Sequence, residues 1–273
     1  MVKQGLKIAY PIFWEEFYEK KLLTFTRGVN SLVKNDLYSF LQSNNEYKFL
    51  RKNDDFNDDF KRFLEFLSWK IEFETKKLLS KLLNISISVN QFHEKAFFNS
   101  LSNIKSSLRV SEFTLKNIHI DNELKMWIAE NTRLIKTIPS NLLGKVEEAV
   151  FNSVRIGYSY RTLAEELEKA FKVSKNRARI IARDQISKFN GSLTRQRNLS
   201  LGITEYRWLT SRDERVRHSH EVLEDKICSW KDATIYKDKE EQKWKKRDGV
   251  KAVLLHPAQD ILCRCTSVAI INI

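Results

Sequence analysis

Two short segments near the C-terminus hold most of the side chains that could do chemistry. The chain has three cysteines and five histidines, and two of those cysteines lie one residue apart in HPAQDILCRC, residues 256–265. The segment TSRDERVRHSH, residues 210–220, combines two further histidines with acidic and basic groups. Imidazole nitrogens and thiolate sulfurs are ligands that zinc prefers in proteins. These segments are therefore the first candidates for a functional site.

Four of these side chains match the ligand set of a tetrahedral zinc site: His220, His256, Cys263 and Cys265. On a strand, both cysteines would face the same side and Arg264 the opposite side. The spacing is not that of paired CxxC knuckles, so a second interpretation stays open. In it, the cysteines are small core residues and His256, next to Pro257, hydrogen-bonds a structural turn.

The segment before His220 could orient or clamp an anion. If it is extended, Asp213, Arg215 and Arg217 project to one side, and the carboxylate pairs with a guanidinium group. That arrangement fits either a buried structural network or a phosphate clamp. A nuclease would use Asp213 and His220 as its best catalytic candidates. The chain has no P-loop, HExxH or GxSxG signature, so we predict that it is not an enzyme.

A basic cluster precedes the second segment and is a candidate for nucleic-acid contact. It consists of Lys243, Trp244, Lys245, Lys246 and Arg247. Cations beside an aromatic ring can hold single-stranded nucleic acid, but a single aromatic residue favours the alternative, a solvated loop. The surrounding run YKDKEEQKWKKRDGVK has no apolar periodicity, so we expect a charged loop or insertion there.

The elements that must position these residues are mostly helical in the first 200 residues. The sequence holds only 7 glycines and 3 prolines, and apolar residues recur at helical spacing. We expect helices over 14–41, 56–83, 93–108 and 122–135, a further helix from Pro139 to Gly157, and two helices capped by Ser159 and Ser174, the last ending before Gly202. The fold class is therefore expected to be α+β: a mainly helical N-terminal portion followed by a small mixed α/β C-terminal domain.

The segments after Gly202 read as strands. EYRWLTS alternates in polarity, KICSW is a second candidate, and CTSVAIINI is rich in β-branched residues. We expect the first and last of these strands to pair with each other, since each needs a partner for its backbone.

Composition limits the compartment and the partners. A net charge of +13 favours nucleic acid or an acidic protein surface as partner. Three unevenly spaced cysteines indicate a reducing compartment rather than a disulfide framework. No stretch has the pattern of a signal peptide or a membrane span, so we expect neither secretion by that route nor membrane insertion.

Taken together, these motifs closely resemble the C-terminal domain of phage head morphogenesis proteins of the Mu protein F group. The matching elements are IARDQ, the strand GITEYRWLTS, the turn DERVRHSH and the closing HP…CRC, preceded by AENTRLIKTIP and GYSYRTLAEELEKAF. The resemblance covers about residues 121–270. We therefore expect two regions, a helical region over 1–120 that associates with portal or capsid and a Mu F-like minor head domain over 121–273. Many relatives carry a glycine where Glu224, Asp225 and Lys226 stand.

The resemblance implies a minor capsid protein of a phage or prophage at the portal vertex. Its expected partners are the portal protein, other capsid proteins and double-stranded DNA, and no membrane. It would be assembled in the bacterial cytoplasm and carried in the virion, at the capsid interior or portal vertex, and would act in procapsid assembly, DNA packaging or ejection. Two alternatives stay open: a metal-dependent nuclease using the DxRVRxxH and HP…CRC residues, and a DNA-binding adaptor without a portal role.

Overall fold

Helices dominate the first 200 residues because apolar side chains recur every three or four positions, as predicted. The computed structural model describes residues 3–43, 54–101, 118–156 and 160–272. The described helices are α1 (Ile12–Ser43), α2 (Asp54–Leu79), α3 (Leu82–Ser100), α6 (Asp121–Ile156), α7 (Tyr160–Ser200) and the short α8 (His218–Glu221). The described strands are β1 (Lys3–Leu6), β2 (Glu205–Leu209), β3 (Ile227–Ser229), β4 (Ile235–Lys237), β5 (Lys245–Lys246) and β6 (Thr266–Asn272).

The chain divides into two compact units, each assembled from separate stretches of sequence. One comprises Met1–Glu15, Asn84–Trp127 and Arg183–Ile273, and the other comprises Glu16–Leu83 and Ile128–Ala182. We call them the sheet unit and the helical unit. The two units are not separated by a single boundary at residue 120. The two regions expected from the sequence, 1–120 and 121–273, describe the extent of a family domain rather than a compact unit and stay a prediction. The α+β fold class is confirmed.

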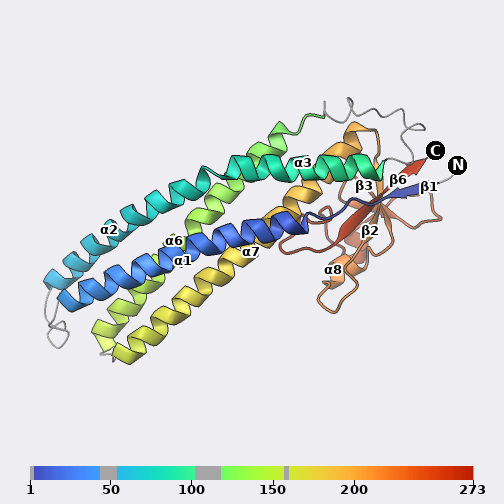
Figure 1. Ribbon diagram of the computed structural model, residues 1–273. Helices are drawn as coiled ribbons and strands as arrows, with labels where there is room; N and C mark the ends of the chain where they lie inside the picture. The colour runs from blue at the N-terminus through green and yellow to red at the C-terminus, as the bar shows by residue number, and fades with distance from the viewer. Residues whose placement is uncertain (1–2, 44–53, 102–117, 157–159, 273) are drawn as a thin grey trace. The chain divides into compact units, whose positions relative to one another are not determined.

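The helical unit consists of parts of α1, α2, α6 and α7 that lie side by side (Figure 1). Its core joins side chains from all four helices, among them Val33 of α1, Phe60 of α2, Val146 of α6 and Phe171 of α7. Burial of such side chains stabilises a helical fold by roughly 1.5–3 kcal/mol each. The predicted apolar stripes are therefore core, as expected.

Several predicted helix boundaries are wrong. Helix α6 continues through Pro139, because buried residues keep helical spacing on both sides, at Ile135, Ile138 and Leu142. Loss of one backbone N–H is tolerated where the packed face is continuous. The helix predicted to start at residue 93 begins earlier, at Leu82, so the preceding segment ISISVNQF, residues 85–92, lies inside α3.

Ser174 is not an N-cap. It lies within α7, where its hydroxyl donates to the Phe171 carbonyl at 2.8 Å and contacts Asn30 Oδ1 at 3.0 Å. The side chain thus bonds back into the helix and to a neighbouring helix. The proposed cap at Ser159 and the end of the helix predicted over 93–108 fall outside the described residues. Helix α7 ends at Ser200 before Gly202, which has φ +74°, as predicted.

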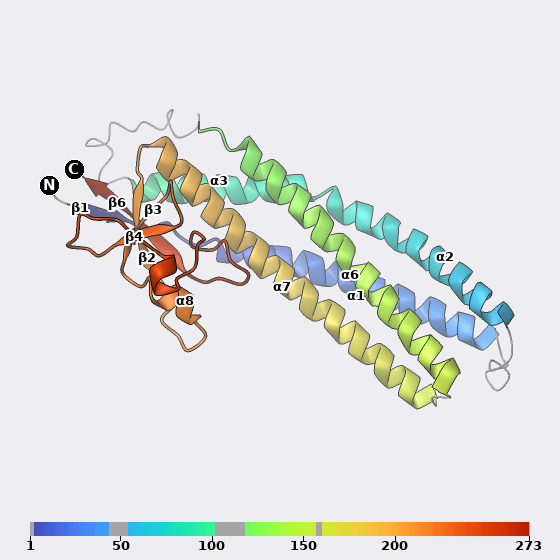
Figure 2. The same ribbon diagram turned by 180° about the vertical axis from the view of Figure 1, so that it is seen from behind.

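A six-stranded antiparallel sheet organises the sheet unit, in the order β1-β6-β2-β3-β4-β5. The predicted pairing of the first and last C-terminal strands is confirmed, with Tyr206 opposite Ala269 and Leu209 opposite Thr266. Strand β1, which the sequence did not predict, pairs with β6 and brings the two ends of the chain side by side (Figure 1). The last turns of α7 run beside the strands, as the rear view shows (Figure 2).

The turn just before β3 contains a residue in a backbone conformation that glycine prefers. Asp225 has φ +60°, in the left-handed region that carries a steric cost for side chains. Its backbone N–H donates to the Trp208 carbonyl at 2.9 Å, which fixes the turn. An aspartate thus occupies a left-handed backbone position that glycine adopts at lower cost.

The charged run before His256 is not simply a loop. It contains β4 and β5, which pair with Ile235 opposite Lys246, and a short 3₁₀ turn, Asp248–Val250. The prediction failed because these strands are only three and two residues long and carry charged side chains.

No helix among the described ranges is long and apolar enough to cross a membrane.

Candidate metal centre

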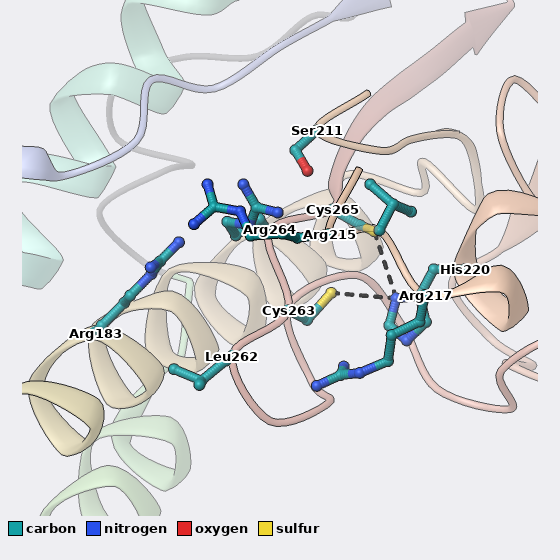
Figure 3. A pocket seen from close by; sticks show the side chains of 10 residues that line it. Arg183, Ser211, Arg215, Arg217, His220, Leu262, Cys263, Arg264 and Cys265 are labelled. Atoms are coloured by element: carbon teal, nitrogen blue, oxygen red, sulfur yellow. Dashed lines mark hydrogen bonds between the residues drawn. The ribbon is translucent and has the colours of Figure 1, made fainter. Parts of the chain in front are cut away.

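His220, Cys263 and Cys265 meet in the sheet unit. The Nδ1 atom of His220 lies 3.5 Å from the Sγ atom of Cys263 and 3.5 Å from the Sγ atom of Cys265. Figure 3 shows both sulfurs directed at the imidazole ring. All three side chains are buried, and their nearest ligand atoms lie within 4.8 Å of one another. The structure thus brings together three of the four ligands proposed from the sequence.

Asp260 holds the far side of the His220 ring. Its Oδ2 atom lies 3.0 Å from His220 Nε2 and also accepts a hydrogen bond from Arg217 at 2.9 Å. Because a carboxylate only accepts hydrogen bonds, Nε2 carries the proton. The Nδ1 atom is therefore the ring nitrogen that faces the two sulfurs. A histidine that binds a metal usually donates its other N–H to such a carboxylate.

Helix α7 fixes the loop that carries the cysteines. Asp184 accepts a hydrogen bond from the backbone N–H of Leu262 at 2.8 Å, and the Ser187 hydroxyl donates to the Cys263 carbonyl at 3.2 Å. Leu262 has φ +53°, so this loop needs external support. The RDQIS stretch of α7 therefore positions the CRC stretch.

Helix α7 also approaches the start of the same loop closely. A Cβ atom on Gly191 would lie 3.0 Å from the Pro257 carbonyl oxygen and from the Ala258 side chain. Glycine at this position allows the backbone of the loop to lie directly on the helix.

Asp213 pairs chiefly with Arg264, which donates to the carboxylate through its two terminal nitrogens, Nη1 and Nη2. The expected contact with Arg215 is present at 3.7 Å, whereas Arg217 pairs instead with Asp260. The segment around Asp213 is a turn rather than an extended strand, which explains the different partners. The hydrogen bonds from Arg264 lower the pKa of Asp213 to about 2. This carboxylate is therefore a poor general base near neutral pH.

A recess of about 230 Å³ opens onto the three side chains. Arginine side chains line much of it: Arg183, Arg215, Arg217 and Arg264 (Figure 3). Arg264 and Arg217 are paired with Asp213 and Asp260, so the four arginines leave the recess with an excess of positive charge that suits an anion.

The charge states within the cluster are coupled. The hydrogen bond with Cys265 first, and then the hydrogen bond with His220, lower the pKa of the Cys263 thiol. The hydrogen bond with Cys263 first, and then burial and the charge on Cys263, raise the pKa of the Cys265 thiol. The hydrogen bond with Cys263 raises the pKa of His220. Burial is the largest single influence on Asp260 and opposes its ionisation. The hydrogen bonds from His220 and the Ile261 N–H, together with the charge of Arg217, outweigh burial and lower the pKa of Asp260. The cluster therefore favours negative charge on one of its two sulfurs, that of Cys263.

His256 does not join the cluster. Its Nδ1 atom lies 3.2 Å from the Tyr206 hydroxyl, and its ring lies against Trp230 with 5.4 Å between ring centroids. Burial first, and then the charges of Arg195 and Arg247, lower the pKa of His256 to about 4. Its backbone N–H donates to Gln259 Oε1 at 2.8 Å, as in the structural-turn interpretation. The expectation that His256 is a fourth ligand is therefore corrected.

The basic cluster at 243–247 is not a uniform cationic surface. Arg247 is fully buried and donates to the carbonyls of Val253 and Leu255, so it cannot contact nucleic acid. Lys245 is paired with Asp238 at 2.9 Å. The Trp244 ring is half-buried and covered by the Lys237 ammonium group, 4.6 Å from its centroid. Lys243 and Lys246 are the exposed members of the set.

Sequence reasoning missed three residues of the site: Asp184, Ser187 and Asp260. Asp260 lies within HPAQDILCRC, but a carboxylate that orients a histidine leaves no spacing signal. Asp184 lies in the IARDQ stretch that carried part of the resemblance, and the link to the cysteine loop is visible only in three dimensions.

Comparison with known proteins identifies the segment that contains the whole site. Residues 144–268 match the family of Phage Mu protein F like proteins. The Mu F-like resemblance predicted from the sequence is thereby confirmed. The Mu F-like segment includes the RDQIS stretch, the DERVRHSH turn and both cysteines of the cluster.

A curated relative from Haemophilus influenzae, an uncharacterized protein, is 30% identical over 168 residues. The match covers 62% of the present chain and 34% of the relative, so the chain spans about a third of that protein's length. No solved structure gives a significant match.

Proposed function

We propose that this protein is a minor head component of a phage or prophage that binds the portal protein and acts in capsid assembly, DNA packaging or ejection. The observation that carries the proposal is the match of residues 144–268 to the Phage Mu protein F like family. The virion, at the capsid interior or portal vertex, is the corresponding location. Other capsid proteins and double-stranded DNA are further partners under this proposal.

An exposed aromatic stripe on α2 supports an assembly role. Phe66, Trp69 and Phe73 are 48%, 68% and 61% exposed. Their spacing of three and four residues places them on one face of the helix. Exposed apolar groups that lie next to one another are typical of protein–protein contact surfaces. We assign this stripe to contact with the portal protein.

Co-purification with the portal protein encoded by the same genome tests the proposal. The wild-type chain is expected to co-elute with the portal assembly. Trp69→Glu with Phe73→Glu should weaken the association at least tenfold, because each charge would have to be buried at the interface. Met126→Glu is the matched control, since Met126 is 72% exposed and lies in the sheet unit. A chain that never co-elutes with portal or procapsid would overturn the proposal.

The salt dependence of DNA binding tests the adaptor alternative. Counterion release predicts affinity that falls steeply with salt and shows little sequence preference. Salt-sensitive DNA binding without portal association would favour the adaptor. Metal-dependent cleavage of DNA would favour the nuclease.

A further inference from the structure

We propose that His220, Cys263 and Cys265 bind one zinc ion, whose fourth coordination position faces the arginine-lined recess and accepts water or an anionic oxygen ligand. The ligand class is a phosphate-like oxyanion. This proposal does not depend on portal binding, because zinc content and portal association are measured separately.

The two nitrogen–sulfur distances fit tetrahedral coordination. Zinc–sulfur bonds of about 2.3 Å and zinc–nitrogen bonds of about 2.0 Å, at the tetrahedral angle, require roughly 3.5 Å between nitrogen and sulfur. Both measured separations from His220 Nδ1 are 3.5 Å. The single lone pair on Nδ1 can accept a full hydrogen bond from only one of the two thiols, whereas one metal ion can bond all three atoms.

The surroundings supply what a metal-binding histidine needs. Asp260 accepts from His220 Nε2 at 3.0 Å, which fixes the tautomer with Nδ1 directed at the sulfurs. Arg217 holds the same carboxylate oxygen at 2.9 Å. Asp184 and Ser187 anchor the loop on either side of Cys263. The three ligands are therefore held in place by groups outside the cluster.

Three protein ligands leave one position open, as in catalytic rather than structural zinc sites. His256, the other candidate, is held at Tyr206 and takes no part. The recess that touches all three ligands is the side from which a fourth ligand can enter (Figure 3).

The charge balance favours an anion as that fourth ligand. Zinc with two thiolates and a neutral imidazole has no net charge. Four arginines line the recess, and the carboxylates of Asp213 and Asp260 neutralise only part of their charge. Guanidinium groups bind oxyanions through paired N–H groups. A phosphate-like oxygen is therefore preferred over a neutral ligand.

Metal analysis of the full-length protein, purified without chelator, is the first test. We expect about one zinc per chain, lost in Cys263→Ser and in Cys265→Ser at retained helical content. Cys228→Ser is the matched control, because Cys228 is a buried free thiol outside the cluster, and it should keep the zinc. Asp260→Asn should weaken zinc binding about 10- to 100-fold rather than abolish it.

A second measurement can be made on the wild-type chain alone, so its main result does not depend on whether a variant folds. Cobalt(II) added to the zinc-depleted protein should give thiolate charge-transfer absorption, and inorganic phosphate should change its visible spectrum. Arg215→Gln should weaken that response to phosphate. An unchanged cobalt spectrum at high phosphate would refute the open position. Absence of metal, with Cys263 and Cys265 alkylated rapidly or joined in a disulfide, would refute the metal site in favour of thiol chemistry.

Discussion

The Asp184 carboxylate accepts the backbone N–H of Leu262 at 2.8 Å and so ties helix α7 to the loop that carries both cysteines. Leu262 has φ +53°, a strained conformation for a side chain of this size, and the hydrogen bond from its N–H helps to hold it. Asp184 is buried, and the Lys188 Nζ atom forms an ion pair with its Oδ2 atom at 2.9 Å. The carboxylate therefore links helix α7 to the backbone of the loop that carries the cysteines.

Asp184→Ala tests this link. A hydrogen bond to a charged group contributes roughly 1.5–3 kcal/mol, so the free energy of unfolding should fall by about that amount. Zinc affinity should fall as well, because the loop loses its support. Denaturant unfolding and zinc titration measure the two effects. Lys188→Ala is the control, and a zinc affinity as low in Lys188→Ala as in Asp184→Ala would contradict the specific role of the Leu262 contact.

Arg247 should matter for stability rather than for nucleic-acid binding. Its guanidinium group donates to the carbonyls of Ile235, Val253 and Leu255 and to the Tyr206 hydroxyl. Arg247→Lys cannot reproduce this planar fork and should destabilise the protein by about 2–4 kcal/mol.

Lys246 is the matched control for Arg247, because it is adjacent and exposed. Lys246→Ala should change the free energy of unfolding by less than about 0.5 kcal/mol. Thermal unfolding followed by circular dichroism measures both variants. Equal stability of Arg247→Lys and Lys246→Ala would show that the buried contacts contribute little.

Two glycines within helices should respond oppositely to alanine. At Gly191 a Cβ atom would meet the Pro257 carbonyl oxygen at 3.0 Å, so Gly191→Ala should cost about 1–2 kcal/mol. At Gly144 nothing lies within 4 Å of the added atom, and Gly144→Ala should gain about 0.5–1 kcal/mol. Chemical denaturation gives both values. A gain at Gly191 would mean that the loop does not lie on the helix.

His93 should make the protein less stable in mild acid. Its Nδ1 atom lies 2.8 Å from Arg197 Nη1, which can only donate, so Nδ1 has no proton and the ring is neutral. Its Nε2 atom lies 2.9 Å from the Thr194 hydroxyl. Burial first, and then the charge of Arg197, hold the pKa of His93 well below its ordinary value of 6.5.

The sign of the pH effect follows from this lowered pKa. The unfolded chain binds a proton at His93 below about pH 6.5 and the folded chain does not, so stability is lost as the pH falls through that value. From pH 7.5 to 5.5 the loss should be about 1.4 kcal/mol larger in the wild type than in His93→Gln. Urea unfolding at the two pH values measures the difference. An equal loss in both proteins would mean that His93 is protonated in the fold.

The sequence predicted those parts of the fold whose pattern is long and periodic. The apolar stripe of α1 and the paired strands β2 and β6 were expected within a few residues. The break at Pro139 was wrong, because burial at helical spacing continues across it. Strand β1 was missed because four residues at the start of the chain pair with a strand at its end. Such pairing leaves no local signal.

The candidate site was predicted by residue type but not by orientation. Three of the four proposed ligands meet, whereas His256 lies against Tyr206, and no sequence pattern distinguishes these two outcomes for a histidine. The buried position of Arg247 was missed for a similar reason, since it stands in a run of charged residues that otherwise face solvent.

X-ray absorption at the zinc edge of the protein as purified tests the metal centre most directly. The structure predicts two sulfur ligands at about 2.3 Å, one imidazole nitrogen at about 2.0 Å and one further nitrogen or oxygen ligand at a similar distance. Phosphate should alter the lighter shell and leave the two sulfurs unchanged. A protein without zinc, or a zinc ion bound by fewer than two sulfurs, would contradict the assignment of His220, Cys263 and Cys265 as its ligands.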